Sequence, residues 1–255
     1  MPRPAAPTFA DACERLLRDP GGEHSLYTTL APVFDRLTDE ERVAGDFEAV
    51  QAFTPESGDA LELGCGVGAL LGHLTDRFDR TLGVDANHDL LRFTAHRAPA
   101  AHVAVGDPLQ PPTDAAFDAV VAMAGPAAPP AVDDPTALIG TVAERLAPEG
   151  TFLLRAVTDA SAVRDAVESV GVLSGSGYRL ERSVTDLPTD GGVDLRMGYR
   201  ATDEESGESA TASETVHVPV HDAESLREAA EAAGLADVRL LEGAATTLLV
   251  ARNGG

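Results

Sequence analysis

The stretch Glu62-Leu63-Gly64-Cys65-Gly66-Val67-Gly68 decides the fold, because it sets three alternating glycines directly after a short apolar segment. Residues 60–61 before it are apolar, as in a buried strand, and residues 69–74 after it have the pattern of a helix. The glycines therefore occupy a strand-to-helix turn, where they permit positive φ and let the backbone approach a ligand. In open α/β sheets, such turns at the carboxyl ends of the strands bind the ligand.

Strands and helices alternate outward from this turn, from about residue 59 to residue 157. Further strands are predicted at 81–85, 102–105, 117–123 and 151–157. The nearly continuous apolar run at 117–123 is typical of a strand buried on both faces of a parallel sheet. A helix is predicted to begin after Asp134, at Pro135, and to end at Pro148. This alternation predicts an α/β, Rossmann-like sheet with helices on both faces.

The pattern changes after residue 157. Residues 178–186, 193–200 and 214–220 predict three antiparallel strands, and a helix at 222–233 and two strands at 235–241 and 246–251 follow them. Residues 8–53 carry helical patterns. We therefore expect an N-terminal helical cap (1–58), a seven-stranded core (59–157 and 221–255) and an inserted helix with a small antiparallel β sheet (158–220). The inserted sheet should lie over the carboxyl ends of the main strands.

The glycine turn by itself leaves the cofactor open. Gly64, Gly66 and Ala69 satisfy the looser dinucleotide fingerprint G-x-G-x-x-A. Glu62 and the third glycine, Gly68, instead resemble the first motif of class I S-adenosylmethionine (SAM)-dependent methyltransferases. An NAD(P)-linked oxidoreductase would need a Tyr-x-x-x-Lys or comparable pair, and the chain has no lysine. The resemblance implies a methyltransferase that uses SAM and releases S-adenosylhomocysteine (SAH).

The resemblance also implies a cofactor site, residue by residue. Asp85 ends the second strand about twenty residues beyond the glycines, where a ribose-binding acid belongs, although it could instead cap the helix at 87–98. Asp107 would accept a hydrogen bond from the adenine amine. Alternatively, Gly106-Asp107-Pro108 is only a turn, because Gly-Asp-Pro is a common turn sequence. The remaining contacts implied are with the methionyl part, the adenine or the methyl group: Glu62, Gly64, Cys65, Gly66, Gly68, Ala86, Pro108, Leu109 and Met123.

The acceptor is less well defined. Residues 26–35 resemble the lead-in of small-molecule methyltransferases, and the whole chain looks similar to the glycine and sarcosine N-methyltransferase type. The plain turn at 124–130 carries no polar residue to hold an acceptor, so Tyr27, Arg155 and His217 are the candidates. With no obvious general base after the fourth strand, an amine that needs only alignment is favoured over a hydroxyl. A small-molecule O-methyltransferase and a non-catalytic SAM-binding or scaffolding protein remain alternatives.

The charge balance is strongly acidic. The chain has 42 acidic and 19 basic residues, a net charge of −23, and all its basic residues are arginines. Such a surface repels itself at low salt, which suggests adaptation to a salt-rich, halophilic cytoplasm and says little about the substrate. No apolar run approaches the roughly 20 residues of a membrane helix, and there is no signal sequence, so we expect a cytoplasmic protein. We expect a small-molecule acceptor. We expect no metal site, no nucleic-acid partner and no membrane partner.

Overall fold

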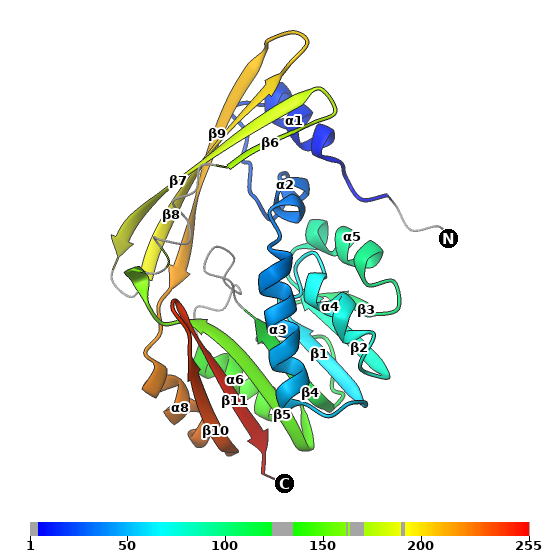
Figure 1. Cartoon of the computed structure of the whole chain (residues 1–255), viewed down its shortest axis with the longest axis vertical. Coiled ribbons are helices and arrows are strands. Elements are labelled where there is room, and N and C mark those ends of the chain that lie inside the picture. The colour runs from blue at the N-terminus through cyan, green and yellow to red at the C-terminus, as the bar shows by residue number, and fades with distance from the viewer. Residues whose placement is uncertain (1–4, 124–134, 162, 164–170, 190–191, 255) are drawn as a thin grey trace.

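The main sheet has seven strands in the order β10-β11-β5-β4-β1-β2-β3 (Figure 1). The computed structural model describes the chain apart from residues 1–4, 124–134, 162, 164–170, 190–191 and 255. The strands are β1 (Asp59–Leu63), β2 (Arg80–Asp85), β3 (His102–Val105), β4 (Phe117–Met123), β5 (Leu146–Val157), β10 (Leu235–Glu242) and β11 (Thr246–Asn253). The pairings among β1 to β5 are parallel, and β11 runs antiparallel to both β5 and β10. This arrangement confirms the predicted Rossmann-like sheet with a reversed last strand.

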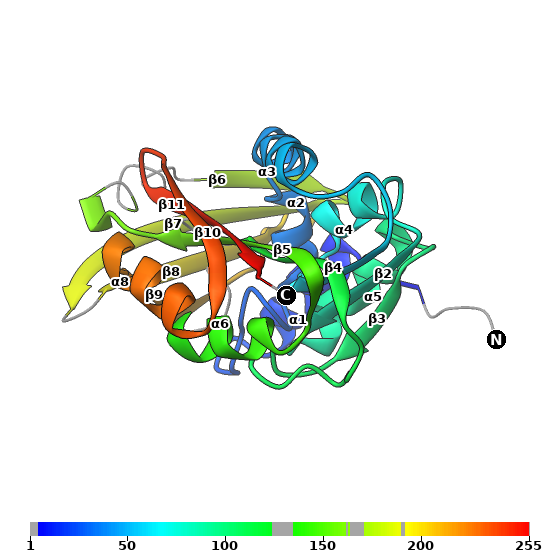
Figure 2. The ribbon, with the colours of Figure 1, turned by 90° about the horizontal axis from the view of Figure 1, so that it is seen from below.

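Helices cover both faces of the main sheet. One face packs against α6 (Pro135–Ala143) and α8 (Ala223–Ala232), and the other against α3 (Glu40–Phe53), α4 (Ala69–Leu74) and α5 (His88–Arg97). Figure 2 shows α3 on one side of the sheet and α6 and α8 on the other. Apart from Asp118, strand β4 is apolar because its side chains alternate between these two layers, with Val120 facing the first and Val121 the second.

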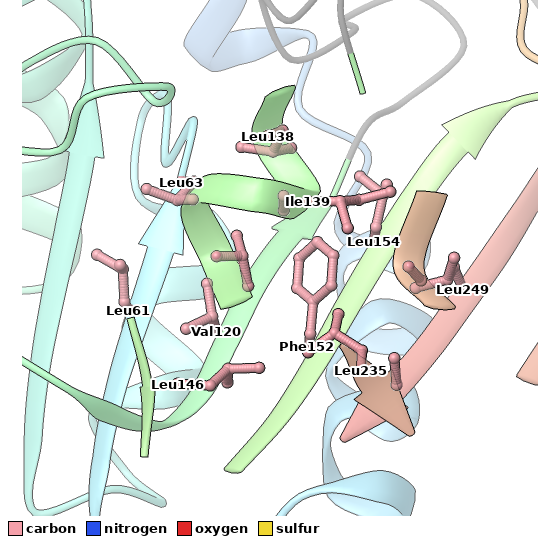
Figure 3. Close-up of a cluster of buried hydrophobic side chains, with 14 of the residues drawn as sticks. Leu61, Leu63, Val120, Leu138, Ile139, Leu146, Phe152, Leu154, Leu235 and Leu249 are labelled. Carbon is pink, nitrogen blue, oxygen red and sulfur yellow. The ribbon is translucent and has the colours of Figure 1, made fainter. Parts of the chain in front are cut away.

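The layer under α6 and α8 is a continuous apolar core. In Figure 3 the ring of Phe152 lies among side chains from the sheet and α6, including Ile139 and Leu154. Phe152 and Ile139 are fully buried, with exposed fractions of 0%. Packing on both faces fixes the strands, and with them the positions of the turns at their carboxyl ends.

The small sheet contains four strands: β6 (Gly171–Gly175), β7 (Tyr178–Thr189), β8 (Gly192–Asp203) and β9 (Ser209–Pro219), in that order. We predicted three strands, which is wrong because β6 was missed. The turn between β6 and β7, at Ser176 and Gly177, has φ values of 55° and 81°, the left-handed geometry of tight hairpins. Serine is not among the residues that usually mark such a turn.

The small sheet lies beyond the carboxyl ends of the parallel strands, as predicted. Val157, the last residue of β5, packs against Val193, Leu195 and Val218 of this sheet. Helices α1 (Phe9–Arg18) and α2 (Ala31–Arg36) pack against its other end, as Figure 1 shows. The N-terminal helices and the small sheet therefore come together above the turns that follow β1 and β2.

The predicted boundary between α6 and β5 is wrong. The helix ends at Ala143 rather than at Pro148, and β5 begins at Leu146 rather than at Thr151. The pairing with β4 shifts between Phe117–Leu146 and Ala119–Thr151, so residues 147–150 bulge from the strand. Within this bulge Glu149 has a φ of 63°, a conformation that favours glycine.

Several predicted features lie outside the described residues. These are the helix cap at Asp134, the turn at 124–130, most of the inserted helix (residues 162 and 164–170) and the hairpin turn at 190–191. Within the described part of the chain, no helix combines the length and apolar character needed to cross a membrane.

Candidate active site at the carboxyl ends of the strands

The glycine turn after β1 has the open backbone that its sequence predicted. Gly64, Gly66 and Gly68 have φ values of 74°, 52° and 81°. The backbone N–H groups of Gly64 and Cys65 both donate to the carbonyl oxygen of Val84, at 2.8 and 3.1 Å, which ties the turn to β2.

Glycine stands at positions 66 and 68 of this turn for different steric reasons. A Cβ atom at position 68 would lie 2.6 Å from Cγ2 and 2.9 Å from Cα of Thr94, so Gly68 is needed for packing against α5. At position 66 a Cβ atom would meet one heavy atom within 4 Å, Cε1 of Phe34 at 3.7 Å. The side of the turn at Gly66 is therefore open to a ligand.

Asp85, the last residue of β2, is buried and holds the turn from the neighbouring strand. Its Oδ2 accepts from the N–H of Gly66 at 2.9 Å, and its Oδ1 accepts from the N–H of Asn87 at 2.8 Å. Asn87 is the N-cap residue of α5, so the alternative of Asp85 as that cap is wrong. Each carboxylate oxygen can accept more than one hydrogen bond, so Asp85 retains acceptor capacity for a ligand.

Glu62 is the least satisfied polar group of the site. Its side chain is buried, and no described residue donates to Oε2. Burial, and then the negative charges of Asp85 and Asp46, raise the pKa of Glu62 well above its usual value. A buried carboxylate oxygen without a partner is a natural site for a donor, and a cationic donor would bring its pKa back down.

The remaining predicted cofactor residues flank the glycine turn. Asp107 is exposed just beyond β3, and its Oδ1 accepts from the N–H of Leu109 at 2.8 Å. Pro108 is buried, Ala86 is exposed after β2, and Met123 is half-buried at the end of β4. The structure thus brings the acids of β1, β2 and the β3 turn to one edge of the sheet.

Arg155 serves a structural ion pair. Its Nε and Nη2 lie 2.8 and 2.7 Å from Oδ1 of Asp46, a buried residue of α3 that also pairs with Arg42 at 2.8 Å. Burial raises the pKa of Asp46, and the two arginines oppose that effect. The cluster fixes α3 to β5, and this engagement argues against a role of Arg155 in binding the acceptor.

His217 lies on the outer face of the small sheet. Its Nδ1 is 2.8 Å from Oδ1 of Asp194 on the neighbouring strand, and its side chain is 43% exposed. Since side chains alternate along a strand, His217 points away from the face that carries Glu214 and Val216. We assign it no part in the site.

Tyr27 lies at the junction between the N-terminal segment, the small sheet and the glycine turn. Its hydroxyl is buried without a hydrogen-bond partner among the described residues, and its ring packs on Phe34 at 5.6 Å. Burial raises the pKa of Tyr27 to about 12, and the charges of Glu214 and Asp85 add to the effect. Tyr27 is therefore a neutral hydrogen-bonding group near both Glu214 of β9 and Asp85 of β2.

Glu214 was not predicted. Its Oε1 accepts from the N–H of Leu26 at 2.8 Å and from the hydroxyl of Tyr199 at 2.7 Å. A signal was present in the sequence, because β9 alternates and places this carboxylate on the same face as Val216 and Val218.

Comparisons with known proteins agree with this geometry. The profile of a family described as "Methyltransferase domain" matches residues 36–240. A curated relative, the dTDP-3-amino-3,4,6-trideoxy-α-D-glucopyranose N,N-dimethyltransferase of Streptomyces venezuelae, is 34% identical over 76 residues. That match covers 30% of this chain and 32% of the relative, about a third of its length.

Solved structures match over a greater length. The crystal structure of DesVI from Streptomyces venezuelae has a TM-score of 0.73 at 25% identity and covers 90% of this chain and 99% of that one. The sugar N-methyltransferase KedS8 from a Streptoalloteichus species has a TM-score of 0.72 at 19% identity, covering 92% and 98%. At 19% identity, the likeness to KedS8 shows a shared fold.

Proposed function

The chain belongs to the methyltransferase-domain family, and from this premise we propose that it transfers a methyl group from SAM to an amine nitrogen of a small molecule. The observation that carries the proposal is the buried, unpartnered Oε2 of Glu62 beside a turn of three glycines with positive φ. This combination suits a ligand that has a cationic donor and a slender chain, as the methionyl part of SAM has.

The proposed contacts divide the cofactor among the ends of three strands. Glu62 would take the ammonium group of SAM, and the backbone from Gly64 to Gly68, including Cys65, would line the methionyl part. Asp85 would accept from the ribose hydroxyls with its remaining lone pairs. Asp107 would accept from the adenine amine. The apolar neighbours would be Ala86, Pro108 and Leu109 beside the adenine and Met123 near the methyl group.

When bound, SAM supplies a methyl group on a positively charged sulfur. The acceptor nitrogen would take this methyl group, and SAH would leave with the electron pair of the broken C–S bond. The methylated nitrogen would then lose a proton to water. The chain contributes alignment and exclusion of water, and a neutral amine needs no general base. Tyr27, with its pKa raised to about 12, stays protonated and can orient the amine without acting as a base.

The acceptor that we propose is an amino sugar. This rests on the curated relative, whose name describes methylation of a nucleotide-linked amino sugar, and on DesVI, which matches nearly the full chain. We further propose that the protein works in a salt-rich cytoplasm. Among the described acidic residues, those that are buried are Asp46, Glu62 and Asp85, so the rest contribute to an acidic surface.

Calorimetric titration with SAM and SAH, followed by a methylation assay, tests the function. We expect both ligands to bind and dTDP-3-amino-3,4,6-trideoxy-α-D-glucose to gain N-methyl groups, detected by mass spectrometry. Binding of NADH with no binding of SAM would refute the cofactor. Binding of SAM with methylation of a hydroxyl would favour an O-methyltransferase, and binding without any product would favour a non-catalytic SAM-binding protein.

A further inference from the structure

Arg182 of β7 faces the interior without a partner. Its Nε is buried, and neither a hydrogen bond nor an ion pair links Arg182 to any residue in the described part of the chain. The other partly buried arginines that the structure describes all donate at least one hydrogen bond. They are Arg42, Arg77, Arg92, Arg97, Arg145, Arg155 and Arg227.

The isolation of Arg182 is not due to a shortage of acids. The chain has 42 acidic residues for its 19 basic ones, so most arginines can find a carboxylate. Exposed arginines need no partner because water solvates them, but a guanidinium nitrogen that is buried and unpaired carries a desolvation cost. Such a group in a folded protein calls for an acceptor that the chain does not supply.

The surroundings of Arg182 place it on the inner face of the small sheet. It pairs across the strands with Tyr199, a buried residue, and Leu180 and Ala201 beside them pack against α1 and α2. The charge of Arg182 acts on Tyr199, since it partly offsets the effects of burial and of Glu214 that raise the pKa of Tyr199.

Glu214 lies on the same face, on the other side of Tyr199. One of its oxygens accepts from Tyr199 and from the backbone of Leu26, and no hydrogen bond from a described residue reaches the other, Oε2. Tyr27, whose pKa responds to both Glu214 and Asp85, connects this carboxylate to the cofactor end of the site. Arg182 lies on β7 and Glu214 on β9, with β8 between them, so their backbones are roughly 10 Å apart.

On the basis of the proposed function, we infer that Arg182 and Glu214 determine which acceptor is bound. Arg182 binds an anionic oxygen of the acceptor, a phosphate or a carboxylate, and Glu214 faces the amine. The carboxylate of Glu214 also stabilises the positive charge that methyl transfer creates on nitrogen. The separation of the two residues favours an acceptor whose amine and anionic oxygen are several bonds apart.

Binding measurements on the SAH-loaded protein test Arg182 without requiring turnover. The variants are R182Q, R182K, which keeps the charge and loses the planar fork, and R196Q, a control on β8 whose arginine is exposed. The probes are dTDP-3-amino-3,4,6-trideoxy-α-D-glucose, the uncharged-oxygen analogue 3-amino-3-deoxy-D-glucose, and 6-aminohexanoate, which tests a carboxylate several bonds from its amine. We expect R182Q to weaken binding of the nucleotide-linked sugar at least tenfold, with less loss in R182K, and to change binding of the free amino sugar less than threefold.

Other results would overturn the assignment of Arg182. It is wrong if R182Q and R196Q bind every probe alike, if R182Q loses affinity for charged and uncharged sugars equally, or if the wild-type protein binds none of the probes. A tenfold loss confined to 6-aminohexanoate would support the arginine and identify the anion as a carboxylate. Thermal melts identify variants that unfold, and R182K then provides the comparison.

For Glu214, E214Q keeps the size and one oxygen acceptor, and D194N removes a carboxylate from the opposite face of the same sheet. We expect kcat for an amine to fall at least tenfold in E214Q with SAH affinity unchanged, and neither to change in D194N. An unchanged kcat in E214Q would remove Glu214 from the proposal. If the wild-type protein binds the acceptor through Arg182 but transfers no methyl group, the proposed function fails while the assignment of Arg182 stands.

Discussion

Two glycines of the same turn should respond differently to alanine. In Gly66→Ala, the added Cβ atom destabilises the left-handed backbone conformation by about 1–2 kcal/mol. Alanine also makes the unfolded chain less flexible, which offsets about 0.4–1 kcal/mol of this cost. The net loss in the free energy of unfolding is about 1 kcal/mol. At position 68, the Cβ atom would also press on Thr94, with Cγ2 at 2.6 Å and Cα at 2.9 Å. Overpacking adds about 1–3 kcal/mol, so Gly68→Ala should cost about 2–4 kcal/mol in total.

Ligand affinity should follow the opposite order. A chain of this size loses about 2–4 °C in Tm per kcal/mol, so Gly66→Ala should lower Tm by about 3 °C and Gly68→Ala by about 9 °C. The Cβ atom of Gly66→Ala projects into the open side of the turn, so this variant should fold and yet lose at least tenfold in SAH affinity. Thermal melts and calorimetry give both quantities. Equal losses of stability, or normal SAH binding by Gly66→Ala, would refute this account of the turn.

Three further predictions use the same measurements. Asp85→Ala should weaken SAM and SAH by about ten- to a hundredfold, the cost of a charged hydrogen-bonding group, whereas the exposed control Asp114→Ala should bind normally; equal affinities would contradict the ribose contact. Glu149→Gly should raise the free energy of unfolding by about 0.5–1 kcal/mol because it relieves the φ of 63°, whereas Glu144→Gly, which has no positive φ to relieve, should lower it. With a net charge of −23, Tm should rise steeply as KCl is added to dilute buffer and then level off towards molar salt, and a Tm indifferent to salt would argue against salt adaptation.

Local patterns were sufficient to predict most of the core. The strands around the glycine turn are continuous or alternating apolar runs, and their alternation with helices predicts a parallel sheet covered on both faces. Local patterns did not predict the backbone at Glu149, to which the structure gives a φ of 63°. Strand β6 was missed because its hairpin turn uses Ser176 at a position usually marked by asparagine or aspartate.

The acceptor side could not be predicted from local patterns, because its contacts join distant parts of the chain. Arg155 looked available beside the site, yet it pairs with Asp46, 109 residues away in the sequence. Glu214 meets the backbone of Leu26 across 188 residues. Which charges are paired inside a fold depends on the packing of elements, and periodicity carries no information about it.

The small sheet enters and leaves the core at one point. The N–H of His221, at the exit of the insertion, donates to the carbonyl oxygen of Val157, at its entrance, at 2.8 Å. Segments whose ends lie together can be lengthened, shortened or exchanged without disturbing the sheet that carries them. Mutations can therefore remodel the insertion while the glycine turn and its acids stay intact. Evolution on this scaffold can change what is methylated without having to reinvent the methylating machinery.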